Sequence, residues 1–402
     1  MNQFINMGKM ISLGNSSWDA ADDSGLLNIA VKHRGGPYLE TTEGHKFINM
    51  CSCSYLGLDT HPEIVRSAAQ SVLEAGTINL PTSRVRIRLQ MLDEVEEQLS
   101  ELFGAIARTT ISCSAGTSGV LPILASGALT SGKKPTMIFD KYSHFSINHI
   151  KPICGDETEV LTCPHNDLNF IEDICKKNSN VAYIADGAYS MGGNAPVKEL
   201  EELQEKYGLF LYFDDSHSVS AYGPNGIGYI RSNLKELSEK TIIVASLAKG
   251  FGACGGIILY GPRLDIPTID RFGGPMSWSQ YINPAGIGAI KASINIHKTN
   301  ELVELQAKLK KNVEYFDRTI ETIDAGNDLP IRVIQVIESS KAIKISEAVF
   351  KKGFYTSAVF FPIVPRGTAG LRVMARADMS LQDITAFCNA VDMITNEYLD
   401  YS

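Results

Sequence analysis

Several features that mark other classes of protein are missing from this sequence. No apolar run approaches the ~20 residues that a membrane-spanning helix needs, so we expect no membrane span. The cysteines are scattered rather than grouped in Cys-x-x-Cys pairs, which argues against both a zinc site and a disulfide framework. Basic residues are too few for broad nucleic-acid binding, because the net charge is −8. The N-terminus lacks the layout of a secretory signal. We therefore expect a cytoplasmic protein that binds neither nucleic acid nor metal.

The composition is that of a globular protein with more than one domain. The chain has 402 residues, of which 44% are hydrophobic and 20% charged. Short apolar runs alternate with helical patterns such as 91–103, and this alternation is typical of an α/β domain around a mostly parallel sheet. The runs that we expect to be strands are 136–140, 181–186, 209–214, 241–246 and 256–260.

The C-terminal part has a different pattern. We expect one long helix over 289–316, strands near 332–336 and 370–374, and helices over 341–352 and 380–398. This pattern indicates a smaller α+β domain. The expected division is an N-terminal arm over 1–45, a large domain over 46–289 and a small domain over 290–402.

Lys249 is the most informative residue. It lies between the strand patterns 241–246 and 256–260, and a glycine-rich turn follows it. A lysine between buried strands is costly unless its charge is used, so a chemical role is favoured. A third strand pattern ends at Asp214, and His217 follows.

Together, these three residues satisfy the main demands of a pyridoxal phosphate (PLP) site. Lys249 would supply the amine for a Schiff base, Asp214 the carboxylate for the pyridine nitrogen, and His217 a contact with the phenolic oxygen. The alternative for Asp214, Asp215 and His217 is a metal cluster or a helix cap. Lys249 favours the cofactor site.

Other residues could complete such a site. His144 follows the strand pattern 136–140 and could stack on the cofactor ring, although a lone histidine after a strand is more often structural. The small residues Gly116, Thr117 and Ser118 precede an apolar helix expected from Val120, and such a helix start binds phosphate well. Ser118 could instead be a simple helix cap. Ser246, before Lys249, is a further candidate phosphate donor.

Arginines give two weaker signals. Arg372 lies on an expected strand and could bind a substrate carboxylate through two hydrogen bonds, although a surface role is the alternative. Arg84, Arg86 and Arg88 alternate along the chain. They could contact a phosphorylated acyl carrier, but a solvated face is the simpler interpretation.

From about Gly36 to the C-terminus, the order of motifs resembles the α-oxoamine synthase family of fold-type-I PLP enzymes. Its members include 8-amino-7-oxononanoate synthase, glycine C-acetyltransferase, 5-aminolevulinate synthase, serine palmitoyltransferase and CqsA. The motifs that carry the resemblance are Ser54-Tyr-Leu-Gly-Leu, Asp140-Lys-Tyr-Ser-His144, Asp186-Gly-Ala-Tyr-Ser190, Asp214-Asp-Ser-His217, Ser246-Leu-Ala-Lys249 and the strand that ends in Leu371-Arg372.

The resemblance implies roles for further residues. Ser190 is expected beside the phenolic oxygen of the cofactor, and Ser279 stands where a neighbouring subunit usually offers a hydroxyl to the phosphate. Cys53 and Ser54 stand at the substrate side, where most relatives have Asn-Asp. This departure lies where the substrates are expected to bind, so the resemblance does not name them.

The implied function is a homodimeric acyltransferase. It would condense an α-amino acid with an acyl thioester, delivered by coenzyme A or an acyl carrier protein, and release carbon dioxide and an α-aminoketone. An aminotransferase or another carbon–carbon lyase would use the same Lys249, Asp214 and His217 without a thioester. An idle scaffold subunit is the non-enzyme alternative, and Lys249 argues against it.

Overall fold

The computed structural model describes residues 7–399, which form two compact units. The large unit comprises residues 61–190 and 194–303, and the small unit comprises 7–60, 191–193 and 304–399. These boundaries differ from the expected division at 45/46 and 289/290. The described part of the expected N-terminal arm belongs to the small unit, because its helix and strands pack with the C-terminal elements.

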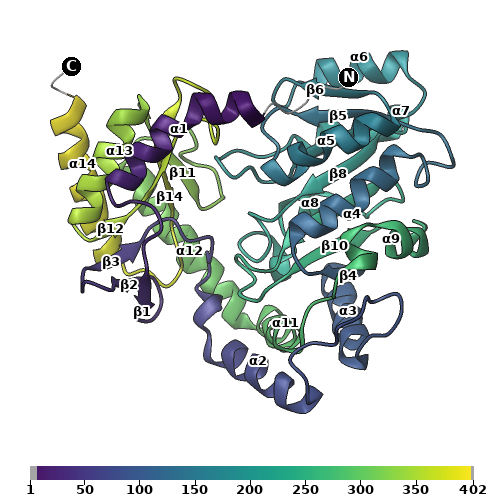
Figure 1. Ribbon diagram of the computed structural model, residues 1–402, viewed down its shortest axis with the longest axis horizontal. Coiled ribbons are helices and arrows are strands. Elements are labelled where there is room, and N and C mark those ends of the chain that lie inside the picture. Colours follow the sequence, from purple (N-terminus) through teal and green to yellow (C-terminus); the bar gives the residue numbers. More distant parts are fainter. Residues whose placement is uncertain (1–6, 400–402) are drawn as a thin grey trace. The chain divides into compact units, whose positions relative to one another are not determined.

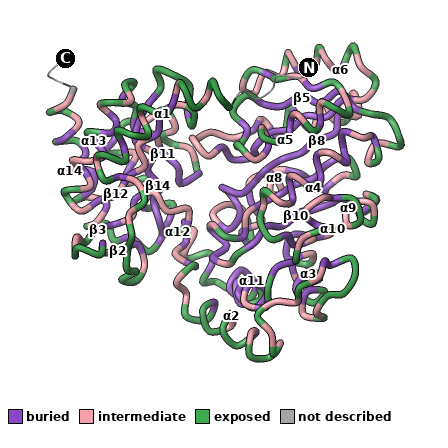
Figure 2. The backbone as a smooth tube through the Cα atoms, viewed as in Figure 1, coloured by how far each residue is buried: buried purple, intermediate pink, exposed green. Residues whose placement is uncertain are grey.

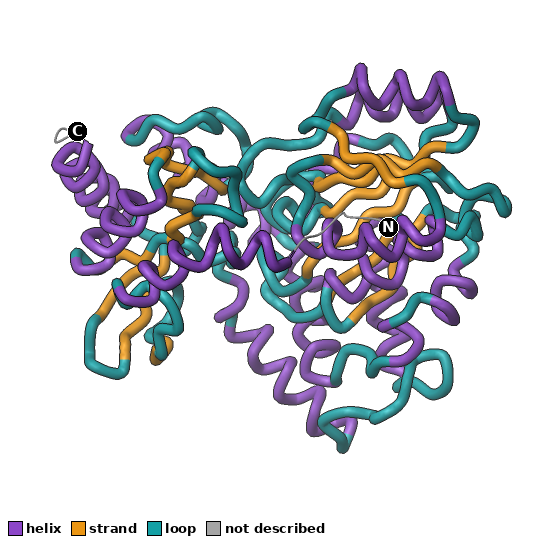
Figure 3. The backbone as a smooth tube through the Cα atoms, turned by 45° about the horizontal axis from the view of Figure 1, so that its top comes forward, coloured by secondary structure: helices purple, strands orange, loops and turns teal. Residues whose placement is uncertain are grey.

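The large unit is built around one sheet with helices on both sides (Figures 1 and 3). Its strands are β4 (Ile106–Thr110), β5 (Thr136–Asp140), β6 (Val160–Cys163), β7 (Val181–Asp186), β8 (Phe210–Asp214), β9 (Thr241–Ser246) and β10 (Gly256–Tyr260). Their order is β4-β10-β9-β8-β7-β5-β6, and only β10 runs antiparallel to its neighbours. The expected mostly parallel sheet is confirmed.

The helices of the large unit connect these strands. They are α2 (Pro62–Ala75), α3 (Gln90–Phe103), α4 (Cys113–Ala125), α5 (Phe145–Glu157), α6 (Leu168–Lys177), α7 (Val197–Tyr207), α8 (Tyr229–Asn233), α9 (Ile266–Phe272), α10 (Pro275–Trp278) and α11 (Pro284–His297), with a 3₁₀ turn at Pro224–Gly226.

The central strands are buried along their whole length because both faces of the sheet are covered (Figure 2). Alternate residues of each strand enter two different hydrophobic cores. Leu211 and Phe213 of β8 face the core that includes α3, α7 and α11, whereas Phe210 and Tyr212 face the core that includes α4 and α5. This double cover explains why these strands are near-continuous apolar runs in the sequence.

The small unit contains two short sheets and several long helices, among them most of α12 (Asn300–Thr319). One sheet has the order β1 (Val31–His33), β2 (Tyr38–Thr41), β3 (Lys46–Asn49), β12 (Phe354–Tyr355), and the other has the antiparallel order β11 (Ile331–Ile337), β14 (Ala369–Met374), β13 (Ser357–Val359). The other long helices are α1 (Met7–Asp23), α13 (Ser339–Lys351) and α14 (Leu381–Leu399), with a 3₁₀ turn at Leu58–Thr60. The expected smaller α+β architecture is confirmed.

The single helix expected over 289–316 was wrong. The chain forms α11, which ends at His297, and α12 (Asn300–Thr319), which crosses the boundary between the units. Thr299 causes the break: its hydroxyl donates to the carbonyl of Ile296 (2.8 Å) and accepts from the amide of Glu301 (3.3 Å). The helical pattern of apolar residues continues through this interruption, so the pattern alone did not reveal it.

None of the helices within residues 7–399 is both long enough and apolar enough to cross a bilayer.

Candidate functional site

The candidate site lies at the carboxyl edge of the central parallel strands of the large unit. Asp186 ends β7, Asp214 ends β8 and Ser246 ends β9. Asp186 and Asp214 are register partners on adjacent strands, so their side chains begin at the same edge of the sheet. In open α/β sheets, ligands bind outside this edge.

Lys249 and His217 contact each other directly. The Lys249 Nζ atom lies 2.9 Å from Nε2 of His217, and His217 is buried. A tight turn holds the lysine: the amide of Leu247 donates to the carbonyl of Gly255 (3.0 Å), and the amide of Ala253 donates to that of Leu247 (2.9 Å). The structure therefore brings together the amine and the imidazole that the sequence placed on separate strand ends.

Asp214 is held from two sides. Its Oδ1 accepts from the amide of Ser216 (3.0 Å), and its Oδ2 lies 3.5 Å from Sγ of Cys113. Burial and the charge of Asp214 raise the pKa of the Cys113 thiol well above its usual value, so the thiol keeps its proton and donates. The hydroxyl of Ser216 accepts from the amide of Ser246 (2.8 Å), which joins the ends of β8 and β9.

A second buried carboxyl lies beside Asp214. Burial, followed by the charge of Asp214, raises the pKa of Asp186 well above its usual range. This shift favours a protonated Asp186 next to Asp214. Asp186 also accepts a hydrogen bond from the amide of His144 (3.0 Å), which ties the end of β5 to the end of β7.

His144 begins helix α5 and is exposed to solvent. Its Nδ1 accepts from the backbone amide of Ser146 (3.3 Å), which makes His144 the N-cap of this helix, and it also lies 2.8 Å from the Ser146 hydroxyl. Ser190 lies in the loop after β7 and is partly exposed. The described contacts place His144 at the edge of the sheet where Asp186 and Asp214 lie; its stacking on a cofactor ring stays a prediction.

The expected start of the phosphate-binding helix was wrong. Helix α4 begins at Cys113, not at Val120, and its N-cap is Ser112, whose hydroxyl accepts from the amide of Ala115 (3.1 Å). Gly116, Thr117 and Ser118 therefore lie inside the helix. The hydroxyl of Thr117 is buried, where it accepts from Tyr212 (2.9 Å) and donates to the carbonyl of Cys113 (3.2 Å).

The small residues of this segment were expected to form a loop. They lie inside the helix instead, where they allow neighbouring segments to pack closely against it. A Cβ atom on Gly116 would lie 3.2 Å from the side chain of Ile258, and one on Gly119 would lie 2.5 Å from the carbonyl of Gly273. The first intrahelical bond joins the amide of Gly116 to Ser112, so the amides of Cys113 and Ser114 lie ahead of it. The expected phosphate-binding loop, 112–119, contains these two residues, but Gly116, Thr117 and Ser118 were chosen as its candidates. Ser112 as an N-cap was the signal for the earlier helix start.

The start of α4 also lies against strand β10 (Figure 1). A Cβ atom on Gly256 would lie 2.4 Å from the amide nitrogen of Cys113, so only glycine permits this approach. Gly256 is the register partner of Ser246. The helix start, Asp214 and Ser246 therefore lie close together.

Ser279 directly follows helix α10 and takes part in none of the contacts given above for Asp214, Ser246 and the start of α4. It lines an open groove of about 760 Å³, together with Arg86 and Trp278 among others. Trp278 is 84% exposed and Ile87 is 64% exposed.

The candidate substrate residues Cys53, Ser54 and Arg372 belong to the small unit. Cys53 Sγ lies 3.7 Å from Sδ of Met374, and the hydroxyl of Ser54 donates to Asp59. Arg372 is on β14, and its Nε and Nη2 atoms are buried with no hydrogen-bond partner within residues 7–399. Arg372 is half-buried, and two buried guanidinium nitrogens without an acceptor are costly, so this position suits an anionic ligand.

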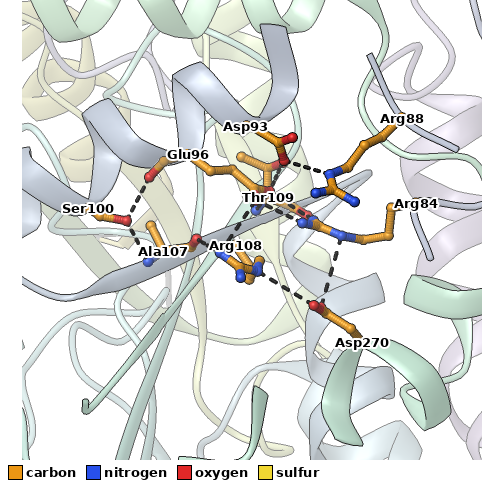
Figure 4. Close-up of polar contacts among 9 residues, drawn as sticks. All are labelled: Arg84, Arg88, Asp93, Glu96, Ser100, Ala107, Arg108, Thr109 and Asp270. Atoms are coloured by element: carbon orange, nitrogen blue, oxygen red, sulfur yellow. Dashed lines mark hydrogen bonds and ion pairs between the residues drawn. The ribbon is translucent and has the colours of Figure 1, made fainter. Parts of the chain in front are cut away.

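The three arginines of the stripe differ in burial: Arg84 is buried, whereas Arg86 and Arg88 are exposed. Figure 4 draws the polar contacts of Arg84 and Arg88. Arg84 is buried and forms a two-bond ion pair with Glu96, with Nη1 at 2.8 Å and Nη2 at 2.7 Å from its carboxylate oxygens. Glu96 also accepts from the amide of Thr109 in β4 (2.7 Å). The interpretation of Arg84 as part of a solvated face was wrong. The side chain is buried, where it pairs with Glu96 of helix α3.

Metal binding was the alternative for the Asp214 loop. Across residues 7–399, no group of three or more His, Cys, Asp or Glu side chains has the arrangement needed to hold a metal ion.

Comparisons with known proteins support a common ancestry over most of the chain. An 8-amino-7-oxononanoate synthase from Petrotoga mobilis is 27% identical over 380 residues, which cover 90% of this chain and 92% of that protein. A serine palmitoyltransferase from Bacteriovorax stolpii is 26% identical and covers 86% of this chain and 81% of its own length.

Solved structures show the same fold. A serine palmitoyltransferase from S. paucimobilis, with a bound PLP-myriocin aldimine, superposes with a TM-score of 0.85 at 20% identity and covers 98% of this chain and 99% of its own. An 8-amino-7-oxononanoate synthase from Francisella tularensis gives a TM-score of 0.70 at 19% identity, covering 88% and 99%.

The chain also matches a family model. Residues 45–391 match the model described as "Aminotransferase class I and II", which covers well over half of the sequence. The chain belongs to the aminotransferase class I and II family.

Proposed function

We propose that this chain is a PLP-dependent acyltransferase that condenses an α-amino acid with an acyl thioester. Carbon dioxide and the free thiol leave, and an α-aminoketone is the product. The observation that carries the proposal is the contact between Lys249 Nζ and His217 Nε2 (2.9 Å) at the strand edge that also holds Asp214. The relatives named 8-amino-7-oxononanoate synthase and serine palmitoyltransferase support the thioester step.

The residues of the large unit fit the cofactor at each of its functional groups. Lys249 would attach its aldehyde, Asp214 would hold a proton on its ring nitrogen, and His217 would contact the phenolic oxygen. The amides of Cys113 and Ser114 would face its phosphate, because they lead a helix start that packs on Gly256 beside Asp214. His144, Ser190 and Ser246 remain proposed contacts. PLP supplies the electron sink that stabilises negative charge on the amino-acid Cα.

Lys249 has a second role in this proposal. When it is not bound to the cofactor, the Lys249 amine would accept the proton from the substrate Cα. The nearby His217 imidazole would orient this amine through the observed contact. The substrate Cα then forms a bond to the thioester carbonyl, and the thiol is the leaving group.

Arg372 is the proposed anchor for the substrate carboxylate. Its buried Nε and Nη2 atoms have no acceptor among residues 7–399, and a carboxylate would satisfy both. Cys53 and Ser54 remain proposed contacts for the substrates, since they stand at the substrate side of the family pattern.

A second copy of the chain is the proposed partner in a homodimer. The groove at Ser279 is bordered by Trp278 and Arg86, and the ring of Trp278 is almost fully exposed. Covering such an apolar side chain would be favourable, and Ser279 would then serve the neighbouring subunit.

The eight cysteines are all thiols, which fits the proposed location in the cytoplasm. Coenzyme A or an acyl carrier protein would deliver the acyl group.

The proposal is tested by screening amino acids and acyl-CoA thioesters with the PLP-loaded protein while measuring release of free thiol. We expect thiol release that requires one particular amino acid. The Arg372→Met variant should raise the KM for this amino acid by about 30- to 150-fold, because charge-assisted hydrogen bonds contribute roughly 2–3 kcal/mol. The KM for the thioester should change little, and Arg372→Lys should be intermediate.

Two results would contradict this reading. Conversion of the amino acid to a keto acid without thiol release would favour the aminotransferase alternative. An unchanged amino-acid KM in the Arg372→Met variant would remove Arg372 from the substrate site.

A further inference from the structure

A buried histidine at the end of α11 contacts both of the loops that carry the candidate site. His297 is 1% exposed. Its Nε2 lies 2.8 Å from the hydroxyl of Ser220, which follows His217 in the loop after β8. Its ring packs on the ring of Phe251, two residues after Lys249, with centroids 4.4 Å apart.

The hydrogen bonds of His297 define one tautomer. Nδ1 lies 2.8 Å from the carbonyl oxygen of Ser293, which can only accept, so Nδ1 carries the proton. Nε2 is then the acceptor for the Ser220 hydroxyl. Burial lowers the pKa of His297 to about 4, which keeps the imidazole neutral at physiological pH.

Neighbouring residues extend this connection to both loops. The hydroxyl of Ser293 donates to the carbonyl of Phe251 (2.6 Å), so α11 holds the Lys249 loop by its backbone as well. On the other side, the amide of Ser220 donates to the carbonyl of Gly226 (2.8 Å). A Cβ atom on Gly226 would lie 2.8 Å from Cδ2 of His297, and φ is +66° there, so glycine is needed for the loop to close over the imidazole.

We propose that His297 is a positioning residue: with Ser293, it fixes the His217 loop and the Lys249 loop relative to each other, and so maintains the contact between Lys249 Nζ and His217 Nε2. The inference rests on the proposed function in one respect, because that function makes this contact important for catalysis. The geometric part, that His297 maintains the contact, can be tested without cofactor.

The test uses histidine-selective ¹⁵N labelling, because the chain has only eight histidines. Signals of His217 and His297 are assigned by comparison with His217→Phe and His297→Phe. In the cofactor-free protein, we expect the His297 signals of a neutral Nδ1–H imidazole. Lys249→Ala should shift the ring signals of His217, and His297→Phe should shift them in the same direction. His297→Gln should restore most of the wild-type shift, because its amide oxygen can accept from Ser220.

Turnover of the PLP-loaded protein is the second readout. The His297→Phe variant keeps an aromatic ring against Phe251, so the stability of the fold should change little. We expect its kcat to fall on the order of tenfold, with little change in either KM. Ser293→Ala should lower kcat in the same way, and His297→Gln should remain within about threefold of wild type.

The outcomes separate the two proposals. His217 signals that do not respond to His297→Phe in a folded variant would overturn the positioning role. The expected NMR shifts without any thioester-dependent turnover in the wild type would overturn the proposed function and leave the positioning role intact. A loss of kcat in His297→Phe that His297→Gln does not restore would also contradict the inference, since it would show that an acceptor for the Ser220 hydroxyl does not maintain the contact.

Discussion

Replacement of Lys249 by alanine is expected to lower kcat by at least about 10³-fold and to remove the visible absorbance of lysine-bound PLP. The change removes the amine that lies 2.9 Å from Nε2 of His217. The measurements are the absorption spectrum and the rate of thiol release.

Two controls make this prediction sharper. Reduction of the loaded wild-type protein with borohydride, followed by peptide mapping, should place the modified lysine at position 249. Lys151 is the matched control: it is buried, and burial lowers its pKa to about 8, but it lies on α5 beside Phe139. Lys151→Met should retain both absorbance and turnover. Labelling at Lys151, or normal turnover in the Lys249→Ala variant, would contradict the assignment.

Replacement of Asp214 by asparagine is expected to have the second-largest effect, a fall in kcat of about 10²- to 10³-fold. The change preserves shape but removes the negative charge that would hold a proton on the ring nitrogen. The amide of Ser216, which now donates to Oδ1, can still donate to the new amide oxygen, so the loop should keep its conformation. The measurements are kcat and the rate at which deuterium enters the substrate Cα from heavy water.

Asp186 provides the matched comparison. It ends the adjacent strand in register with Asp214, but its raised pKa favours the neutral form, so Asp186→Asn changes little charge. We expect a fall in kcat of at most about tenfold for this variant. Equal effects of the two substitutions would mean that the charge of Asp214 has no special role.

The sequence predicted the central sheet well because its strands carry a strong signal. Strands such as β7 and β8 are buried on both faces, so they appear as unbroken apolar runs, and their ends contain the ionisable Asp186 and Asp214. Lys249 and His217 could be predicted to lie together because both follow carboxyl ends of neighbouring parallel strands.

Features that depend on tertiary contacts were not predictable in this way. The close approach of α4 to β10 depends on Gly116 packing against Ile258 and on Gly256 making room for Cys113, and neither contact is local in the sequence. The buried state of Arg84 depends on its pairing with Glu96 in helix α3.

The break after His297 was missed for a different reason. It is accompanied by local hydrogen bonds of the Thr299 hydroxyl, but the helical pattern of apolar residues continues through it.

His297 illustrates the same limit. Nothing in its sequence neighbourhood distinguishes it from a structural histidine at a helix end. Its significance comes from Ser220 and Phe251, which the fold brings to opposite sides of one imidazole.

The most direct test of the proposed condensation uses an amino acid labelled with ¹³C in its carboxyl group, together with an acyl-CoA and the PLP-loaded protein. The amounts of labelled carbon dioxide and free thiol are measured together. We predict one labelled carbon dioxide for each thiol released, and neither product from the Lys249→Ala variant. Amino-acid consumption with the label retained in a keto acid, and with no thiol released, would contradict the account.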